Sequence, residues 1–251
     1  MLRFFRTLRQ KLLTENKFSR YLLYAVGEIL LVVVGILIAL QVDSWKNAKE
    51  NDLQAQKVLS ALYKEFTKNK VQLIRVKSYH SRVISASNDL LDLIAHTPDK
   101  YDERVMDSLL AEYSYFMTFN PYHSALEASI SSGDIHLIEN DSLINLLFSY
   151  PAMVSDANEE EFQSKQLLFQ HKEAFLYEYI REVDIWSDRG LKPQSNRKSP
   201  FQSNYSGLLN NPVFENTVYD RQGIVQELVN EQNAILEVNN LILNLIKKEM
   251  K

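Results

Sequence analysis

One stretch near the start of the chain restricts its fold more than any other. Residues 21–40 read YLLYAVGEILLVVVGILIAL, and Glu28 is the only charged residue among them. At 1.5 Å per residue, a helix of twenty residues is about 30 Å long, which equals the thickness of the hydrocarbon core of a bilayer. The stretch therefore predicts a transmembrane helix, which we place at residues 21–42.

The distribution of charge predicts how this helix is oriented. Residues 1–20 carry six basic residues and one acidic residue, a net charge of +5, whereas the residues after 40 carry −8. Basic residues gather on the cytoplasmic side of a span, so the N-terminus is predicted to be cytoplasmic. Residues 43–251 then form a domain on the other side. The alternative is a cleaved signal peptide, but Gln41 does not fit a small-residue cleavage site, which favours an uncleaved anchor.

The first residues, MLRFFRTLRQKLL, place apolar and basic side chains at helical spacing. Arg3, Arg6, Arg9 and Lys11 are therefore predicted to lie against the anionic inner leaflet, in an amphipathic arm that covers residues 1–20. A targeting presequence has similar chemistry. The span that follows immediately favours the membrane-surface arm.

Glu28 is the most informative residue in the span. At 100° per residue, Gly35 and Ala39 both lie within about 20° of Glu28 around the helix, so the three form one stripe. Small residues four apart allow two membrane helices to approach closely. The stripe predicts an interface with a second copy or with another membrane protein. The alternative is that Glu28 reaches to the cytoplasmic interface of the membrane; a proton path through one span is less favoured.

The composition of the rest indicates an all-α protein. The chain has six glycines, six prolines and no cysteine, so it has few turn residues and no disulfide, thiol catalysis or iron–sulfur cluster. From Trp45 to His96 there is neither Gly nor Pro, and apolar residues alternate in steps of three and four. We expect an antiparallel helical bundle whose first and last helices are long and coiled-coil-like. The first of these has a seam of eleven positions: Leu59, Leu62, Phe66, Asn69, Leu73, Val76, His80, Val83, Ser87, Leu90 and Ile94.

Local signals predict the remaining elements. A helix is expected over Tyr101–Phe116, and another over Tyr122–Ser132, with Pro121 at its first turn and Gly133 as its C-cap. The next helix is capped by Asn140 or Asp141 and ends near Pro151. The later elements are a helix from Asp156 to Trp186, a long loop over residues 187–212, and a last helix from Asn216 to Lys248 with a seam of Ile224, Leu228, Glu231, Ile235, Val238, Ile242 and Leu245.

The sequence contains no pattern typical of a catalytic, cofactor or metal site. Nucleotide-binding glycine motifs, zinc-protease and calcium-loop motifs are absent, and no histidine follows a glutamate by three residues as in di-iron bundles. The pairs His123–Glu127 and His136–Glu139 have spacings that fit a metal, but surface or capping roles are commoner. Ser195 and Lys198 match a Ser-x-x-Lys pattern without its partner motifs. No cofactor and no enzymatic activity are predicted, and the acidic body disfavours nucleic-acid binding.

The segment from Tyr113 to Phe119, followed by Tyr122, is rich in aromatic residues. Its simplest interpretation is core packing. The alternative is the wall of a groove that receives a ligand or a partner helix. His80, on the first seam, is interpreted as a residue that fixes register.

Three parts of the chain resemble one family. These are ENKFSRYLLYAVGEILLVVVGILIALQVDSW at residues 15–45, FNPYHSALEASISSGDIHLIEN at 119–140, and NPVFEN at 211–216. They are similar to a family of uncharacterised single-pass membrane proteins of Gram-negative bacteria, classed as a domain of unknown function. The resemblance implies an inner-membrane protein with a periplasmic helical domain, and it implies no activity.

The leading hypothesis is a membrane-anchored structural or protein-interaction module on the outer face of the inner membrane. Its expected partners are the lipid bilayer and either a second copy or another membrane protein. The alternative is a periplasmic ligand-sensing bundle that acts through a partner subunit. An enzyme is the third hypothesis, and it would depend on His123 or His136.

Overall fold

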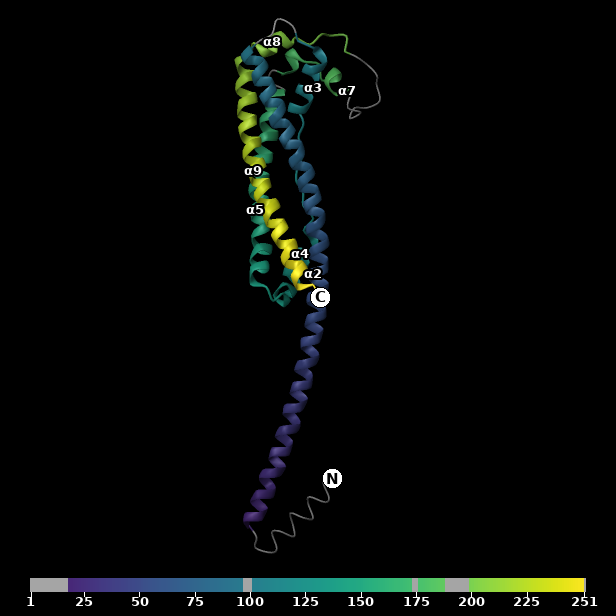
Figure 1. The fold of residues 1–251 in the computed structure, drawn as a ribbon, viewed down its shortest axis with the longest axis vertical. Coiled ribbons are helices and arrows are strands. Elements are labelled where there is room, and N and C mark those ends of the chain that lie inside the picture. Colours follow the sequence, from purple (N-terminus) through teal and green to yellow (C-terminus); the bar gives the residue numbers. More distant parts are fainter. Residues whose placement is uncertain (1–17, 97–100, 173–175, 188–198, 251) are drawn as a thin grey trace. The chain divides into compact units, whose positions relative to one another are not determined.

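The computed structural model describes residues 18–96, 101–172, 176–187 and 199–250. The chain divides into two compact units, Met1–Ala55 and Gln56–Lys251. Every regular element in the described part of the chain is a helix, which confirms the prediction of an all-α protein (Figure 1). Helix α2, Phe18–His96, is continuous across the boundary between the units.

The first unit contains the apolar part of α2. From Leu22 to Leu40 nearly every apolar side chain is exposed, including Leu23, Leu31 and Ile38. Of the described helices, α2 is the one long and apolar enough to cross a membrane, and none of its most apolar window is buried in the protein. The predicted span is therefore helical, and its most apolar window is not buried by the described part of the chain.

The second unit contains the rest of α2 and the remaining helices. Within this unit α5 and α9 run side by side, and α3, α7 and α8 gather at one end, whereas α4 lies at the other (Figure 1). Gln56 Nε2 donates to the carbonyl of Glu249 at 3.0 Å, so the end of α9 meets the part of α2 that begins this unit. The elements are α3 Glu103–Tyr113, α4 Ser124–Ser132, η1 Asp134–Leu137, α5 Asp141–His171, α6 Tyr177–Tyr179, α7 Glu182–Ser187, α8 Tyr205–Leu209 and α9 Pro212–Glu249.

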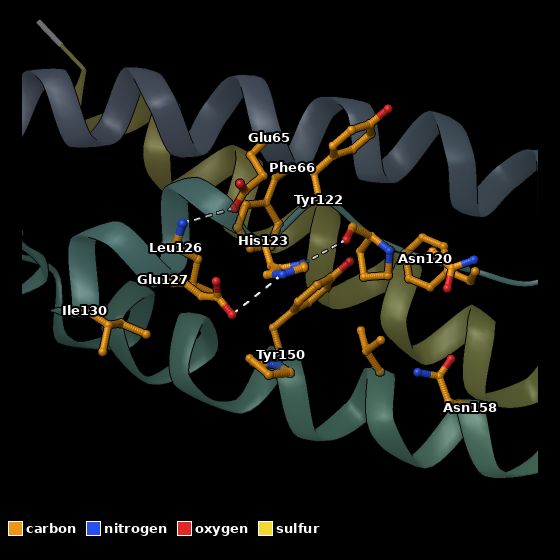
Figure 2. Close-up of a pocket in the computed structure, with 14 residues that line it drawn as sticks. Glu65, Phe66, Asn120, Tyr122, His123, Leu126, Glu127, Ile130, Tyr150 and Asn158 are labelled. Atoms are coloured by element: carbon orange, nitrogen blue, oxygen red, sulfur yellow. Dashed lines mark hydrogen bonds and ion pairs between the residues drawn. The ribbon is translucent and has the colours of Figure 1, made fainter.

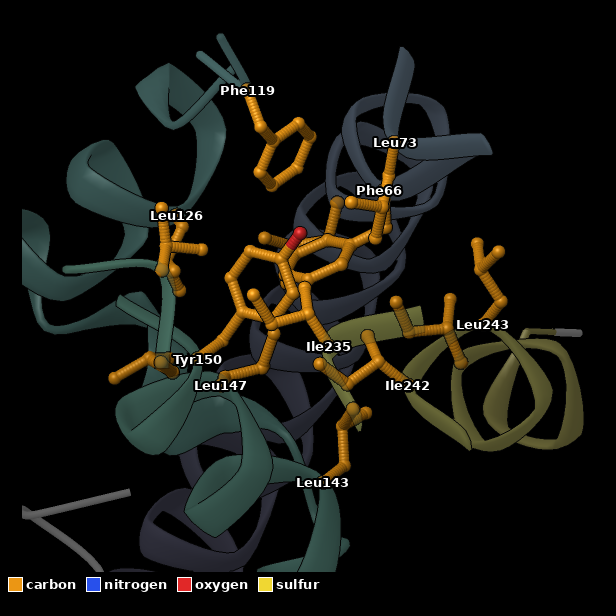
Figure 3. Close-up of a cluster of buried hydrophobic side chains, with 14 of the residues drawn as sticks. Phe66, Leu73, Phe119, Leu126, Leu143, Leu147, Tyr150, Ile235, Ile242 and Leu243 are labelled. Atoms are coloured by element: carbon orange, nitrogen blue, oxygen red, sulfur yellow. The ribbon is translucent and has the colours of Figure 1, made fainter. Parts of the chain in front are cut away.

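A hydrophobic cluster joins α2, α5 and α9 at the α4 end of this unit. Figure 3 shows Phe66 of α2, Tyr150 of α5 and Ile242 of α9 among the side chains that meet there. The Phe66 and Tyr150 rings pack edge to face, with centroids 4.9 Å apart. The predicted α2 seam is buried from Leu59 to Leu90, and Ile94 is partly buried. A second cluster at the other end is formed by residues such as Leu90, Tyr113, Leu176, Leu208 and Phe214.

Two predicted helix boundaries are confirmed. Gly133 ends α4 with φ of 80°, a left-handed conformation that glycine adopts without strain. The Asn140 side chain accepts a hydrogen bond from the N–H of Leu143 at 2.9 Å and caps α5. Both are signals that act over a few residues, which is why the sequence alone identifies them.

The predicted break at Pro151 is wrong, because α5 continues through it. Proline removes one helical hydrogen bond and crowds the preceding turn. The buried face of α5, however, carries Leu147 and Tyr150 before Pro151 and Val154 after it. Burial on both sides of the proline favours one continuous helix.

The predicted helix from Asp156 to Trp186 is also wrong. Asp156 lies inside α5, which ends at His171, and Ile180 is extended after the short helix α6. Polar contacts stabilise this irregular path. Lys172 Nζ donates to Glu182 Oε1 at 2.6 Å, and the Arg181 N–H donates to Ser203 Oγ at 3.1 Å.

The other boundaries shift as well. The second predicted helix is α3, which is shorter than expected, and Pro121 lies outside α4 instead of in its first turn. Helix α9 begins at Pro212 with Asn211 as its N-cap, earlier than predicted, and the short helix α8 lies within the range predicted as a loop. The predicted seam of α9 is only partly right, because its buried line also includes Arg221, Gln232 and Asn239. Four predicted seam residues are only partly buried: Ile224, Glu231, Val238 and Leu245.

Candidate functional site

Residues 115–123 form a non-helical segment that connects α3 with α4. Buried polar side chains from three helices bind the backbone of this segment and of the first turn of α4. We call this set, Glu65, Asn69, His80, Glu161 and Arg221, the buried polar ladder. All five residues are buried. A non-helical segment inside a helical protein lacks the regular backbone partners of a helix or sheet, so side chains must satisfy its buried N–H and C=O groups.

The ladder bonds follow the segment in order. Arg221 Nη2 donates to the carbonyl of Tyr115 at 2.7 Å, and His80 Nε2 lies 2.9 Å from the carbonyl of Met117. The N–H of Phe119 donates to both Glu161 oxygens, at 2.9 and 3.2 Å. These bonds fix the depth and register of the segment between the helices.

The last two ladder residues lie on α2 and hold the end of the segment and the start of α4. Asn69 bonds both backbone groups of Tyr122. The Glu65 carboxylate accepts from the N–H groups of Ala125 at 2.6 Å and Leu126 at 3.2 Å. Glu65 thereby satisfies N–H groups in the first turn of α4, which the N-cap residue His123 does not bond through its side chain.

Burial controls the protonation of the ladder. Because Nε2 of His80 donates to a carbonyl, Nδ1 is left to accept from Gln232 Nε2 at 3.0 Å, and burial lowers the pKa of His80, so the imidazole is neutral. Burial raises the pKa of Glu161 to about 7 against the opposing hydrogen bonds from Phe119 and Gln232. Burial lowers the pKa of Arg221 to about 10, and its guanidinium lies 4.9 Å from the centroid of the Tyr113 ring.

A pocket of about 410 Å³ adjoins the ladder at the α4 end. Figure 2 shows Glu65 and Phe66 of α2, Glu127 of α4 and Tyr150 of α5 around it. Its size falls in the range of small-molecule sites, and its lining is mainly apolar with a few polar groups. The lining residues are Glu65, Phe66, Phe119, Asn120, Pro121, Tyr122, His123, Leu126, Glu127, Ile130, Tyr150, Pro151, Val154 and Asn158.

The pocket is lined by both buried and exposed side chains. The rings of Phe66, Phe119 and Tyr150 are each no more than 3% exposed. At the rim, His123 Nε2 lies 3.6 Å from Glu127 Oε1, and both side chains are about two-thirds exposed. The floor is therefore held by the hydrophobic cluster, whereas the rim is open to a molecule from solvent.

Tyr150 connects the pocket with the buried polar residues. Its hydroxyl accepts from Asn239 Nδ2 at 3.4 Å, and burial raises the pKa of the phenol to about 12, with the nearby Glu65 carboxylate adding to the rise. Tyr150 is thus a neutral phenol at physiological pH.

The residues predicted for the membrane interface lie on the apolar part of α2. Gly35 and Ala39 are exposed, Glu28 is partly exposed, and a Cβ added at Gly35 would meet no atom within 4 Å. Their role as an interface stays a prediction. Arg3, Arg6, Arg9 and Lys11, and also Ser195 and Lys198, lie outside the described residues.

Neither of the two His–Glu pairs considered as metal ligands belongs to a larger group of candidate ligands in the described residues. His123 and Glu127 are close to each other at the pocket rim, but within the described part of the chain no three His, Asp or Glu side chains are grouped to hold a metal ion. The aromatic segment fits both of its interpretations. Tyr113 is buried in the core, Phe119 is buried and also lines the pocket, and Tyr122 lies exposed on the pocket wall.

The sequence patterns do not identify Glu65, Glu161 or Arg221 as site residues, and they identify Asn69 and His80 only as seam positions. The available signal was a polar residue at a buried helical position, because such a residue requires a partner. The partner here is backbone from a distant segment, which the periodicity of one helix does not reveal.

Residues 28–151 match the model of a family described as "Family of unknown function (DUF6090)". This agrees with the resemblance to an uncharacterised family. The matched range contains Glu28, Gly35 and Ala39 and all pocket residues except Val154 and Asn158. No curated protein and no solved structure matches the chain.

Proposed function

We propose that the protein is a single-pass membrane protein whose helical unit is an interaction module on the outer face of the inner membrane. The observation that carries the proposal is the apolar surface of α2, because nearly every apolar side chain from Leu22 to Leu40 is exposed. Exposing this much contiguous apolar surface to water is unfavourable, whereas the interior of a bilayer accommodates it.

The distribution of charge supports the orientation. The net charge of +5 before the span favours a cytoplasmic N-terminus, held by Arg3, Arg6, Arg9 and Lys11 at the inner leaflet. Residues 43–251 then lie in the periplasm as an antiparallel bundle, with α2 and α9 as its long coiled-coil-like helices.

The stripe of Glu28, Gly35 and Ala39 supports an interaction within the membrane. The open space around Gly35 in the single chain leaves room for a second helix to approach closely. The partner is a second copy or another membrane protein that offers a matching small-residue face.

The test is crosslinking in native membranes with two differently tagged copies of the full chain. A crosslinked product of defined mass is expected for the wild type and should be lost in Gly35→Leu. Gly27→Leu is the matched control, because Gly27 is exposed but about 100° from Glu28 around the helix. Equal crosslinking in both variants would contradict an interface on this stripe.

The pocket supports a second function, a periplasmic ligand sensor. A hollow of about 410 Å³ with a buried aromatic floor and an exposed polar rim is suited to a small molecule. Such a sensor would pass its signal across the membrane through a partner subunit. A small molecule that raises the thermal midpoint of the full-length protein in nanodiscs, and no longer does so in Ile130→Trp, would support this function.

A further inference from the structure

The pocket lining contains more acidic than basic residues. Glu65 and Glu127 each contribute a carboxylate, and His123 is the one lining residue able to carry a positive charge. A charged group that enters from the rim therefore meets two carboxylates. This arrangement disfavours an anion and favours a cation.

The position of Glu65 is fixed. The carboxylate is buried, and each of its oxygens accepts one hydrogen bond from the first turn of α4. A carboxylate oxygen has a second lone pair, so Glu65, which lines the pocket, retains acceptor capacity. Its field reaches the pocket floor, since it contributes to the raised pKa of Tyr150.

The floor of the pocket is aromatic. Phe66, Phe119 and Tyr150 are aromatic, buried and shielded from solvent. The face of an aromatic ring attracts a cation, and the attraction is strongest where water is excluded. Prolines and aliphatic side chains complete the wall, and they suit an apolar body attached to the cationic group.

We propose that this pocket binds an organic cation, an ammonium group attached to an alkyl or aryl body, with its charge between Glu127 and the aromatic floor. The proposal rests on the ligand-binding function proposed second above, and it names the chemical class of the ligand. It is independent of the interface predicted at Glu28, Gly35 and Ala39.

The test uses the full-length protein in nanodiscs of zwitterionic phosphatidylcholine, so that lipid charge does not attract the probe. Benzyltrimethylammonium is titrated by calorimetry, alongside the neutral N,N-dimethylbenzamide and the anion phenylacetate. We expect the cation to bind at least about tenfold more tightly than the neutral compound, and phenylacetate to bind most weakly.

Glu127→Gln removes one carboxylate at an exposed position without changing the shape of the pocket. It should weaken binding of the cation by about five- to tenfold and leave binding of the neutral compound unchanged. Glu237→Gln, an exposed glutamate on α9 outside the pocket, is the matched control and should bind like the wild type. Ile130→Trp should block all three compounds.

Each failure has a distinct meaning. Equal binding of the cation and the neutral compound, or no effect of Glu127→Gln, would overturn the cation proposal and leave a ligand pocket. No binding of any compound at about 10 mM would overturn the cation proposal and also count against the ligand-sensing function. None of these results tests membrane anchoring, because the experiment starts from protein that is already inserted in nanodiscs.

Discussion

The side-chain amide of Asn69 bonds both backbone groups of Tyr122. Asn69 Nδ2 donates to the Tyr122 carbonyl at 2.8 Å, and Asn69 Oδ1 accepts from the Tyr122 N–H at 2.7 Å. The pair resembles one rung of a β-ladder in which a side chain replaces the second strand. Because Asn69 is completely buried on α2, this contact links a long helix directly to the pocket wall.

Replacing Asn69 should therefore destabilise the protein strongly. In Asn69→Ala the two backbone groups of Tyr122 lose their partner, and we expect the free energy of unfolding to fall by about 2–4 kcal/mol. Chemical denaturation of the full-length protein in detergent, followed by circular dichroism, measures the change. Asn244→Ala, an exposed position on α9, should change stability by less than about 0.5 kcal/mol. A loss equal to that of this control would contradict the role given to Asn69.

Glu161 should make stability depend on pH. Burial raises its pKa to about 7 from an ordinary value of 4.5, so the folded protein holds a proton that the unfolded chain releases at lower pH. The stabilisation is complete below about pH 4.5 and is lost as pH rises through about 7. Burial and the Glu160 carboxylate raise the pKa of Glu231 on α9, which adds a loss in the same direction. Burial lowers the pKa of His80 and of His171, which acts the opposite way, but only below about pH 6.5.

Comparing variants isolates the effect of Glu161. Glu161→Gln retains an oxygen to accept from Phe119 and removes the titration, so it should be more stable than the wild type by on the order of 3 kcal/mol at pH 8, and close to it at pH 5. The measurement is the unfolding free energy of both proteins at these two pH values. Glu159→Gln, an exposed neighbour on α5, should show no such pH-dependent difference. A constant difference between Glu161→Gln and the wild type would refute the raised pKa.

Signals that act within one helix were predictable from the sequence. The α2 seam, the Gly133 C-cap and the Asn140 N-cap each depend on spacing or on a few neighbouring residues, and all three are confirmed. The prediction at Pro151 was wrong because the sequence shows only the local destabilisation of a helix by proline. The burial of Tyr150 and Val154, which offsets this destabilisation, depends on packing against α2 and α9.

The site could not be predicted for the same reason. Glu161 and Phe119 are 42 positions apart, and Arg221 and Tyr115 are 106 apart. Nothing in the spacing along one helix pairs such residues. These polar residues come together only because α2, α5 and α9 pack around residues 115–123.

Two glycines should respond oppositely to substitution by alanine. Gly223 lies exposed inside α9, and an added Cβ would meet no atom within 4 Å, so Gly223→Ala should stabilise the protein by about 0.5–1 kcal/mol. Gly133 has φ of 80°, so Gly133→Ala should destabilise it by about 1–2 kcal/mol. The measurement is the thermal midpoint of each variant relative to the wild type, which should rise in Gly223→Ala and fall in Gly133→Ala. A loss of stability in Gly223→Ala would show that this position tolerates no side chain.

The proposed orientation predicts the behaviour of fusions to the C-terminus. Alkaline phosphatase, which matures only outside the cytoplasm, should be active when fused after Lys251, and green fluorescent protein should be dark at the same position. Replacing Arg3, Arg6, Arg9 and Lys11 by glutamine should lower the phosphatase activity, because the basic arm fixes the orientation. Fluorescence of the green fluorescent protein fused to the wild-type chain would place the C-terminus in the cytoplasm and would contradict the proposed orientation.

Carbonate extraction of cell membranes tests the central claim, anchoring by the apolar part of α2, most directly. We expect the full-length protein to stay in the membrane pellet at pH 11. A triple variant, Leu31→Lys, Val34→Lys and Ile38→Lys, should move to the supernatant, since each lysine costs about 2.5–3.5 kcal/mol at the centre of a span. Release of the wild-type protein at its full length would contradict the account.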